Sequence, residues 1–149
     1  GFIDMDEEKI NWNEFGKGVF LVNTLGVIFD PSKKQFLIGR RDKDKFVENL
    51  TWVFPGGRPI YGEDFEASFE KIVQKKTGLK IKSLGPIFAR LFKENNKMLL
   101  IYYLCEVIGG KEKPSDDIKE LKWVKAEDLE KHFTTSFDER LKEFIMNLR

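Results

Sequence analysis

The chain has 149 residues, 41% of them hydrophobic, and its 26 lysines and arginines nearly balance its 25 aspartates and glutamates. This composition predicts one packed domain, residues 1–149, and excludes a disordered chain. The near-zero net charge does not point to nucleic acid or to a membrane surface as a partner. The longest apolar run, residues 98–105, is too short to span a bilayer. With a single cysteine, Cys105, and no signal-peptide pattern, we expect an intracellular, cytoplasmic protein.

The first third of the chain predicts an arm followed by a β-hairpin. Residues 1–17 mix acidic and apolar side chains, as in an arm that packs on the domain or on a second copy in a homodimer. Residues 19–29 are rich in β-branched and aromatic side chains and end at a turn signal, residues 30–34. Residues 35–41 are the expected return strand, and a charged loop, residues 42–49, follows.

The stretch from residue 52 to residue 79 contains the clearest helix signal. A Pro-Gly-Gly turn and a loop precede about three helical turns, for which Asp64 is a suitable N-cap and Gly78 a suitable C-cap. Apolar residues at helical spacing predict one buried stripe. The stripe consists of Phe65, Phe69, Ile72 and Val73.

The second half of the chain predicts strands followed by two helices. Residues 80–92 alternate loosely, whereas residues 98–107 are continuously apolar, as in a strand at the centre of a sheet. Residues 120–124 predict a last short strand, and residues 126–132 and 138–148 predict helices. Strands on both sides of a central helix, with helices at the end, predict an α+β fold in which a mixed β-sheet lies between helices.

The central stretch resembles the box of the Nudix family, MutT-like hydrolases of nucleoside diphosphate derivatives. That box reads G-x5-E-x7-R-E-U-x-E-E-x-G-U, where U is aliphatic. Gly57 and Glu63 match its first glycine and first glutamate, Lys71 stands at the arginine, and Gly78 matches the last glycine. The resemblance covers about residues 18–148 and implies the Nudix fold. It also implies that Glu63 pairs with Lys71 and holds the loop against the helix.

Three positions of the box depart from the family. Where the family has the glutamates that hold magnesium, this chain has Ile72, Lys75 and Lys76. These positions share one helix face, and an aliphatic side chain and two ammonium groups do not ligate magnesium. We therefore expect no metal site in the box and no cofactor, with Mg²⁺ required only if other carboxylates form a rearranged site. The carboxylates considered for such a site are Glu63, Glu66, Glu70, Glu94, Asp116 and Asp117.

Four basic side chains are candidates for binding phosphate. Lys75 and Lys76 are expected either to bind a phosphate in place of metal or to form a solvated helix face. Arg41 and Arg58 match arginines that contact the leaving diphosphate in the GDP-mannose mannosyl hydrolase branch, which the chain also resembles. These four groups are expected to surround one cleft with no acidic side chain nearby. In that branch a C-terminal histidine is the general base, so His132 is a candidate for this role or an ordinary helix-end histidine.

Aromatic side chains leave two interpretations open. They either stack a nucleobase over the sheet or belong to the core. The residues concerned are Tyr61, Phe88, Phe92, Tyr102 and Tyr103.

Three functions remain open. We prefer a binding or regulatory module for a nucleotide, a nucleotide sugar or another phosphorylated small molecule, because the scaffold is kept while the catalytic glutamates are absent. The second is an active hydrolase of a nucleoside diphosphate sugar that uses a rearranged metal site. The third is a structural subunit with a vestigial pocket.

Overall fold

The computed structural model describes residues 11–14, 16–44, 47 and 49–148. The expected N-terminal arm therefore lies largely outside the described residues. Within it, only the short 3-10 helix η3 (Trp12–Glu14) has regular structure among the described residues.

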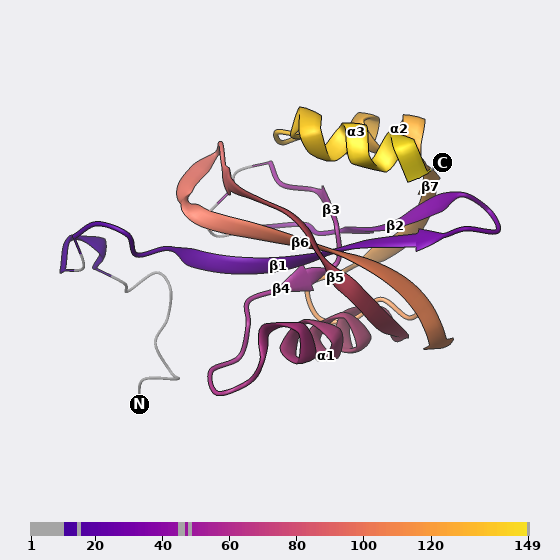
Figure 1. Cartoon of the computed structure of the whole chain (residues 1–149), viewed down its shortest axis with the longest axis horizontal. Helices are drawn as coiled ribbons and strands as arrows, with labels where there is room; N and C mark the ends of the chain where they lie inside the picture. Colours follow the sequence, from indigo (N-terminus) through magenta and orange to yellow (C-terminus); the bar gives the residue numbers. More distant parts are fainter. Residues whose placement is uncertain (1–10, 15, 45–46, 48, 149) are drawn as a thin grey trace.

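One mixed β-sheet organises the chain (Figure 1). Its strands run in the order β3-β2-β1-β6-β5, with β4 beside β1 and β7 beside β2. The β1 and β6 strands are parallel, and the other pairs are antiparallel. The strands are β1 (Leu21–Asp30), β2 (Gln35–Arg40), β3 (Trp52–Val53), β4 (Gly56–Gly57), β5 (Leu79–Phe92), β6 (Asn95–Gly110) and β7 (Glu120–Lys125), and the helices are α1 (Phe65–Thr77), α2 (Ala126–His132) and α3 (Glu139–Leu148).

Helices cover both faces of this sheet. Figure 1 shows α1 on one face and α2 with α3 on the other. Along β6, Leu100 and Tyr102 pack in the core beneath α2 and α3, whereas Tyr103 and Cys105 pack in the core beneath α1. Since side chains alternate along a strand, β6 is buried on both sides, as its apolar sequence predicts. The α+β fold with a mixed sheet between helices is confirmed.

The boundaries of α1 follow its capping residues. The carboxylate of Asp64 accepts a hydrogen bond from the Ala67 amide at 3.1 Å, and Gly78 ends the helix with φ of 75°. A left-handed conformation of this kind favours glycine. Phe69 and Val73 are fully buried, but Phe65 is 44% exposed, so its place in the buried stripe was wrong. Phe65 lines the cleft described below.

The Pro-Gly-Gly loop lies directly against β1. The hydroxyl of Thr24 donates to the carbonyl oxygen of Gly57 at 2.9 Å, and the Gly26 amide donates to Pro55 at 2.8 Å. A Cβ atom at Gly56 would lie 1.9 Å from the carbonyl oxygen of Thr24, so only glycine fits there. This close approach sets the position of the loop relative to α1.

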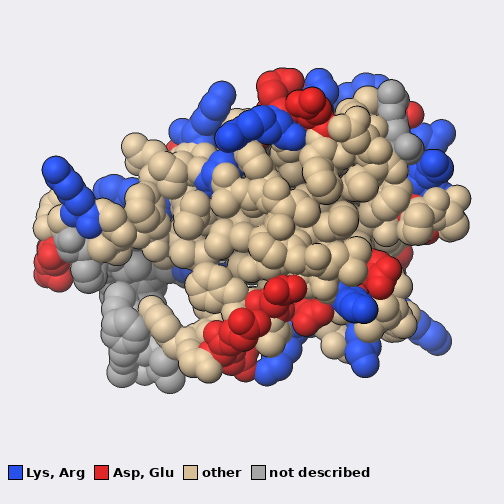
Figure 2. Space-filling model, viewed as in Figure 1, with Lys and Arg blue, Asp and Glu red and all other residues tan. Residues whose placement is uncertain are grey.

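The surface shows both signs of charge (Figure 2), as expected from the nearly equal numbers of basic and acidic residues. On the face drawn in Figure 2, basic and acidic side chains alternate around the periphery. None of the helices in the described part of the chain is long and apolar enough to cross a membrane.

Candidate functional site

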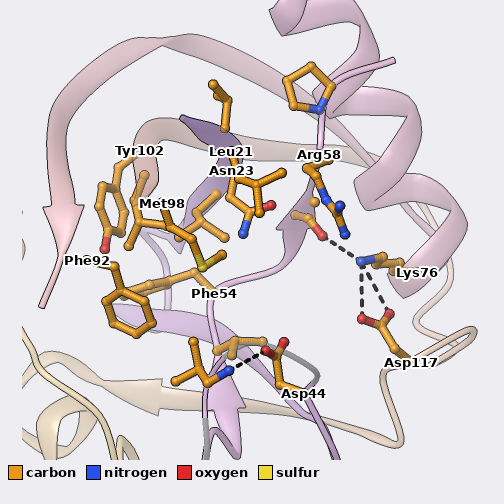
Figure 3. Close-up of a pocket in the computed structure, with 18 of the residues that line it drawn as sticks. Leu21, Asn23, Asp44, Phe54, Arg58, Lys76, Phe92, Met98, Tyr102 and Asp117 are labelled. Atoms are coloured by element: carbon orange, nitrogen blue, oxygen red, sulfur yellow. Dashed lines mark hydrogen bonds and ion pairs between the residues drawn. The ribbon is translucent and has the colours of Figure 1, made fainter. Parts of the chain in front are cut away.

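A cleft of about 810 Å³ opens beside the Pro-Gly-Gly loop. One end is charged, and Figure 3 shows Arg58, Lys76 and Asp117 together there. The other end is apolar and aromatic. Its residues include Phe54, Phe92, Met98, Leu100, Tyr102 and Phe133. One charged residue, Arg90, also lines the cleft and donates from Nε to the hydroxyl of Tyr102 at 3.2 Å.

Lys76 projects from the last turn of α1 into the charged end. Its Nζ atom donates to the carbonyl oxygen of Gly56 at 2.8 Å and lies 3.2 Å from Oδ1 of Asp117. The side chain is only 18% exposed. Burial lowers the pKa of the Lys76 ammonium, and the charge of Asp117 opposes that shift. The chain thus holds a cation of its own inside the cleft.

Arg41 reaches the same carboxylate from the end of β2. Its Nε atom lies 3.1 Å from Oδ2 of Asp117, and its NH1 atom lies 2.9 Å from Oδ2 of Asp44. Asp117 therefore bridges the guanidinium of Arg41 and the ammonium of Lys76. The expectation of a cleft with no acidic side chain nearby was wrong.

The loop that carries Asp117 is fixed to α1 by its backbone. The amides of Lys113 and Ser115 donate to the carbonyl oxygens of Thr77 and Lys76 at 2.8 and 2.9 Å. These carbonyls belong to the last turn of α1 and have no partner within the helix. Docking on the helix end turns a loop that the sequence suggests is solvated into one wall of the cleft.

The remaining two basic candidates differ in position. Arg58 follows Gly57 directly and lines the cleft, where burial lowers the pKa of its guanidinium. Lys75 is 75% exposed, lies outside the lining residues and has its Nζ atom 3.8 Å from Oδ2 of Asp116. Successive helix residues are rotated by about 100°, so Lys75 and Lys76 do not face one point. Arg41, Arg58 and Lys76 are brought together, and Lys75 is not.

His132 lies outside the cleft lining. Its Nδ1 atom is 2.8 Å from the backbone oxygen of Asp128, and its Nε2 atom is 2.9 Å from Nζ of Lys122. Because an ammonium only donates, Nε2 accepts from Lys122 and Nδ1–H donates to Asp128. Both ring nitrogens are therefore engaged at the end of α2.

The framework residues of the box keep their contacts. Nζ of Lys71 donates to Oε1 of Glu63 at 2.6 Å, which holds the loop against α1. A Cβ atom at Gly57 would lie 3.3 Å from Nζ of Lys76, tighter than most contacts, so this glycine gives Lys76 room. Gly78 ends the helix, as described above.

The aromatic candidates divide between the cleft and the core. Tyr61 lines the cleft and is exposed, whereas Phe92 and Tyr102 line it but are almost fully buried in the core beneath α2 and α3. Tyr103 instead stacks on Phe69 with 5.0 Å between ring centroids, in the core beneath α1, and Phe88 packs in the opposite core against Tyr102.

Three polar lining residues, Asn23, Asp44 and Arg90, were not selected from the sequence, and Asp117 was considered only as a possible metal ligand. The signal available for Asp117 was the dipeptide Asp116-Asp117, which complements Lys75-Lys76 in charge. Asn23, on β1, has no comparable signal.

The side chains present do not fit a magnesium ion held as in the family. In the described part of the chain, no group of three or more His, Cys, Asp or Glu side chains could hold a metal. Asp117 and Asp44 are paired with basic groups. Glu70 accepts a hydrogen bond from the Ser83 amide at 3.0 Å and so points toward β5. A hard divalent cation requires several converging oxygen ligands.

The sheet and the covering helices define an α+β domain with a cleft beside its Gly-Gly loop. The family model described as the NUDIX domain matches residues 19–148, and the chain therefore belongs to the Nudix family. No curated protein matches the chain.

Solved structures agree with this assignment. The chain is similar to the MutT protein from Methanosarcina mazei Go1, with 18% identity, a TM-score of 0.66, and 89% of this chain and 94% of that one covered. It is also similar to an ADP-ribose pyrophosphatase from Streptococcus suis, with 17% identity, a TM-score of 0.59, and coverage of 72% and 75%. A UDP-X diphosphatase gives 18% identity, a TM-score of 0.62, and coverage of 97% and 70%. At these identities the similarity shows the fold.

Proposed function

We propose that the protein binds a nucleotide or another phosphorylated small molecule in the cleft, and does not perform the magnesium-dependent hydrolysis of its family. One observation carries this proposal. The ammonium of Lys76 is held inside the cleft, 2.8 Å from the Gly56 oxygen, at a box position where the family resemblance implies a metal-binding glutamate. The cleft therefore contains an ammonium group at the position where the resemblance implies a ligand for metal.

The charged end suits a phosphate group. Arg41, Arg58 and Lys76 present guanidinium and ammonium donors, which form charge-assisted hydrogen bonds with phosphate oxygens. The carboxylates of Asp117 and Asp44 offset part of this positive charge, so the cleft is not strongly basic. A diphosphate would compete with these carboxylates for the donors of Arg41 and Lys76.

The apolar end suits a ring system. Tyr102 and Phe92 line it, and Figure 3 shows the Asn23 side chain in the cleft between these aromatic residues and Arg58. A volume of about 810 Å³ lies within the range of small-molecule sites. Because Arg41 and Arg58 both line the cleft, we favour a nucleoside diphosphate sugar, the substrate type of the GDP-mannose mannosyl hydrolase branch.

The absence of a fitting carboxylate set explains why hydrolysis would be impaired. A metal in such an enzyme supplies Lewis-acid stabilisation and an activated water, each worth several kcal/mol. The degenerate box provides neither through Ile72, Lys75 or Lys76.

A hydrolase with a rearranged site is the second candidate. Oε2 of Glu63 and Oδ1 of Asp117 are buried and have no hydrogen-bond partner among the described residues. Carboxylate oxygens without a hydrogen-bond donor are available as ligands for a divalent cation bound outside the usual box position.

Titration calorimetry in excess EDTA tests the proposal with ADP, GDP and GDP-mannose as ligands. We expect the wild type to bind at least one of them, and to bind it more weakly as salt is raised. Lys76→Glu should weaken binding by at least about tenfold, because it replaces a donor with a repelling carboxylate.

Lys75→Glu is the matched control, since it makes the same charge change at an exposed side chain. It should change affinity by less than about twofold. Absence of binding by the wild type, or equal loss in both variants, would show that the cleft has no such ligand.

A further inference from the structure

Three oxygen atoms surround the ammonium group of Lys76. The Gly56 carbonyl oxygen lies 2.8 Å from Nζ, and the two carboxylate oxygens of Asp117 lie at 3.2 and 3.4 Å. Figure 3 shows these contacts as the dashed lines that meet at Lys76. A backbone carbonyl and a carboxylate are the oxygen ligands that hard cations prefer in proteins.

We propose that these oxygens form a cation site whose permanent occupant is the Lys76 ammonium, and that Lys76 thereby excludes free divalent cations from the cleft. This deepens the proposed function and rests on the same placement of Lys76, because it concerns which cation the site holds, and it applies whether or not a phosphorylated ligand binds.

Contacts other than those of the Lys76 ammonium position these oxygens, because backbone pairing holds Gly56 and the Asp117 loop, and Nε of Arg41 lies 3.1 Å from Oδ2 of Asp117. The Gly56 oxygen belongs to β4, which pairs with β1 through Leu25 and Thr24. Asp117 lies on the loop whose amides at Lys113 and Ser115 bond to the end of α1. We therefore expect the oxygens to stay close to their present positions when the ammonium is removed.

The carboxylate of Asp117 retains unused acceptor capacity. Its Oδ1 atom is buried and, although within ion-pair distance of Lys76, forms no hydrogen bond of suitable geometry with the described residues. A buried carboxylate oxygen without a donor has a desolvation cost that a closer cation would offset.

Charge explains the exclusion of free metal. A divalent cation that approached Asp117 would meet the positive charges of Lys76 and Arg41, both within 3.2 Å of its carboxylate. Like charges at such separations repel strongly in a partly buried site. A tethered ammonium also has a high effective concentration, so dissolved cations do not readily displace it.

The test uses Mn²⁺ alone as the probe, with no nucleotide present. Electron paramagnetic resonance reports free Mn²⁺, and calorimetry reports the stoichiometry. We expect no saturable Mn²⁺ site in the wild type or in Lys75→Glu. Lys76→Glu should bind one Mn²⁺ per chain at least about tenfold more tightly than Lys75→Glu, because a repelling charge becomes a ligand. The double variant Lys76→Glu/Asp117→Asn should lose this site.

Three results would overturn the inference: a wild type that binds Mn²⁺ as tightly as Lys76→Glu, a Lys76→Glu variant no better than Lys75→Glu, or a double variant that binds equally well. If Lys76→Glu is unfolded without metal, recovery of its circular dichroism on adding Mn²⁺ counts as binding, and failure to recover counts against the site. Failure of nucleotide binding would leave these outcomes unchanged, so the two proposals are tested separately.

Discussion

The Nζ atom of Lys76 lies 3.2 Å from Oδ1 of Asp117 inside the cleft, whereas the adjacent pair, Lys75 and Asp116, meets at 3.8 Å on the surface. Two neighbouring lysines at the end of α1 thus face two neighbouring aspartates on the loop between β6 and β7. The inner pair is partly buried and the outer pair is exposed. Exposed ion pairs contribute little to stability. Substitutions in the outer pair, Lys75 and Asp116, are therefore suitable controls for the same substitutions in the inner pair.

Asp117 competes with an anionic ligand for Lys76 and Arg41. Asp117→Asn removes one negative charge from the cleft, so affinity for ADP in EDTA should rise about threefold to tenfold, from an effect on the order of 1 kcal/mol. Asp116→Asn should change the affinity by less than about twofold. Calorimetry on both variants checks this, and weaker binding by Asp117→Asn would show that Asp117 contacts the ligand favourably.

The packing of Gly26 against Phe69 predicts a non-additive pair of substitutions. A Cβ atom at Gly26 would lie 2.9 Å from Cζ of Phe69, so Gly26→Ala should destabilise the protein by about 1–3 kcal/mol. Phe69→Leu shortens the opposing side chain and should reduce that cost by at least about 0.5 kcal/mol in the double variant. Urea unfolding measures each free energy, and strictly additive values would contradict the contact.

Cys105 is buried in the core beneath α1, and burial raises the pKa of its thiol, with smaller contributions from Glu70 and Glu66. The unfolded thiol ionises near pH 8.5. Above that pH the folded state keeps a proton that the unfolded state has lost, so stability should fall by up to about 1.4 kcal/mol per pH unit.

Cys105→Ala should lack this component of the pH dependence, which urea unfolding at pH 8 and pH 10 under reducing conditions will measure. The native thiol should also react with a thiol reagent only as fast as the protein unfolds. Rapid labelling of the folded protein, or equal pH slopes in the two proteins, would contradict this account of Cys105.

Local sequence patterns predicted the elements that depend on local interactions. The boundaries of α1 follow apolar spacing and the caps Asp64 and Gly78, and the expected helix at residues 126–132 is α2. The two-sided burial of β6 follows from its continuous apolar run. Phe65 fits the same helical spacing but is exposed and lines the cleft. Helical spacing alone does not reveal which positions of an apolar stripe the rest of the fold leaves uncovered.

The charge arrangement of the site depends on non-local contacts. Asp117 reaches Lys76 because the amides of Lys113 and Ser115 bond to the end of α1, and no periodicity marks such docking. The parallel pairing of β1 with β6 likewise joins segments far apart in the chain. Basic residues were therefore recognised as candidates from the resemblance, while their acidic partners and the outward direction of Lys75 became evident only in the structure.

The central claim is that the cleft binds a phosphorylated ligand and does not hydrolyse it with magnesium. Phosphorus-31 NMR of GDP-mannose with the wild-type protein tests both parts in one sample. In EDTA, the diphosphate resonances should shift or broaden on adding protein, and no monophosphate resonance should grow after excess Mg²⁺ is supplied. Unperturbed resonances for GDP-mannose, ADP and GDP, or magnesium-dependent turnover above about one per second, would contradict the account.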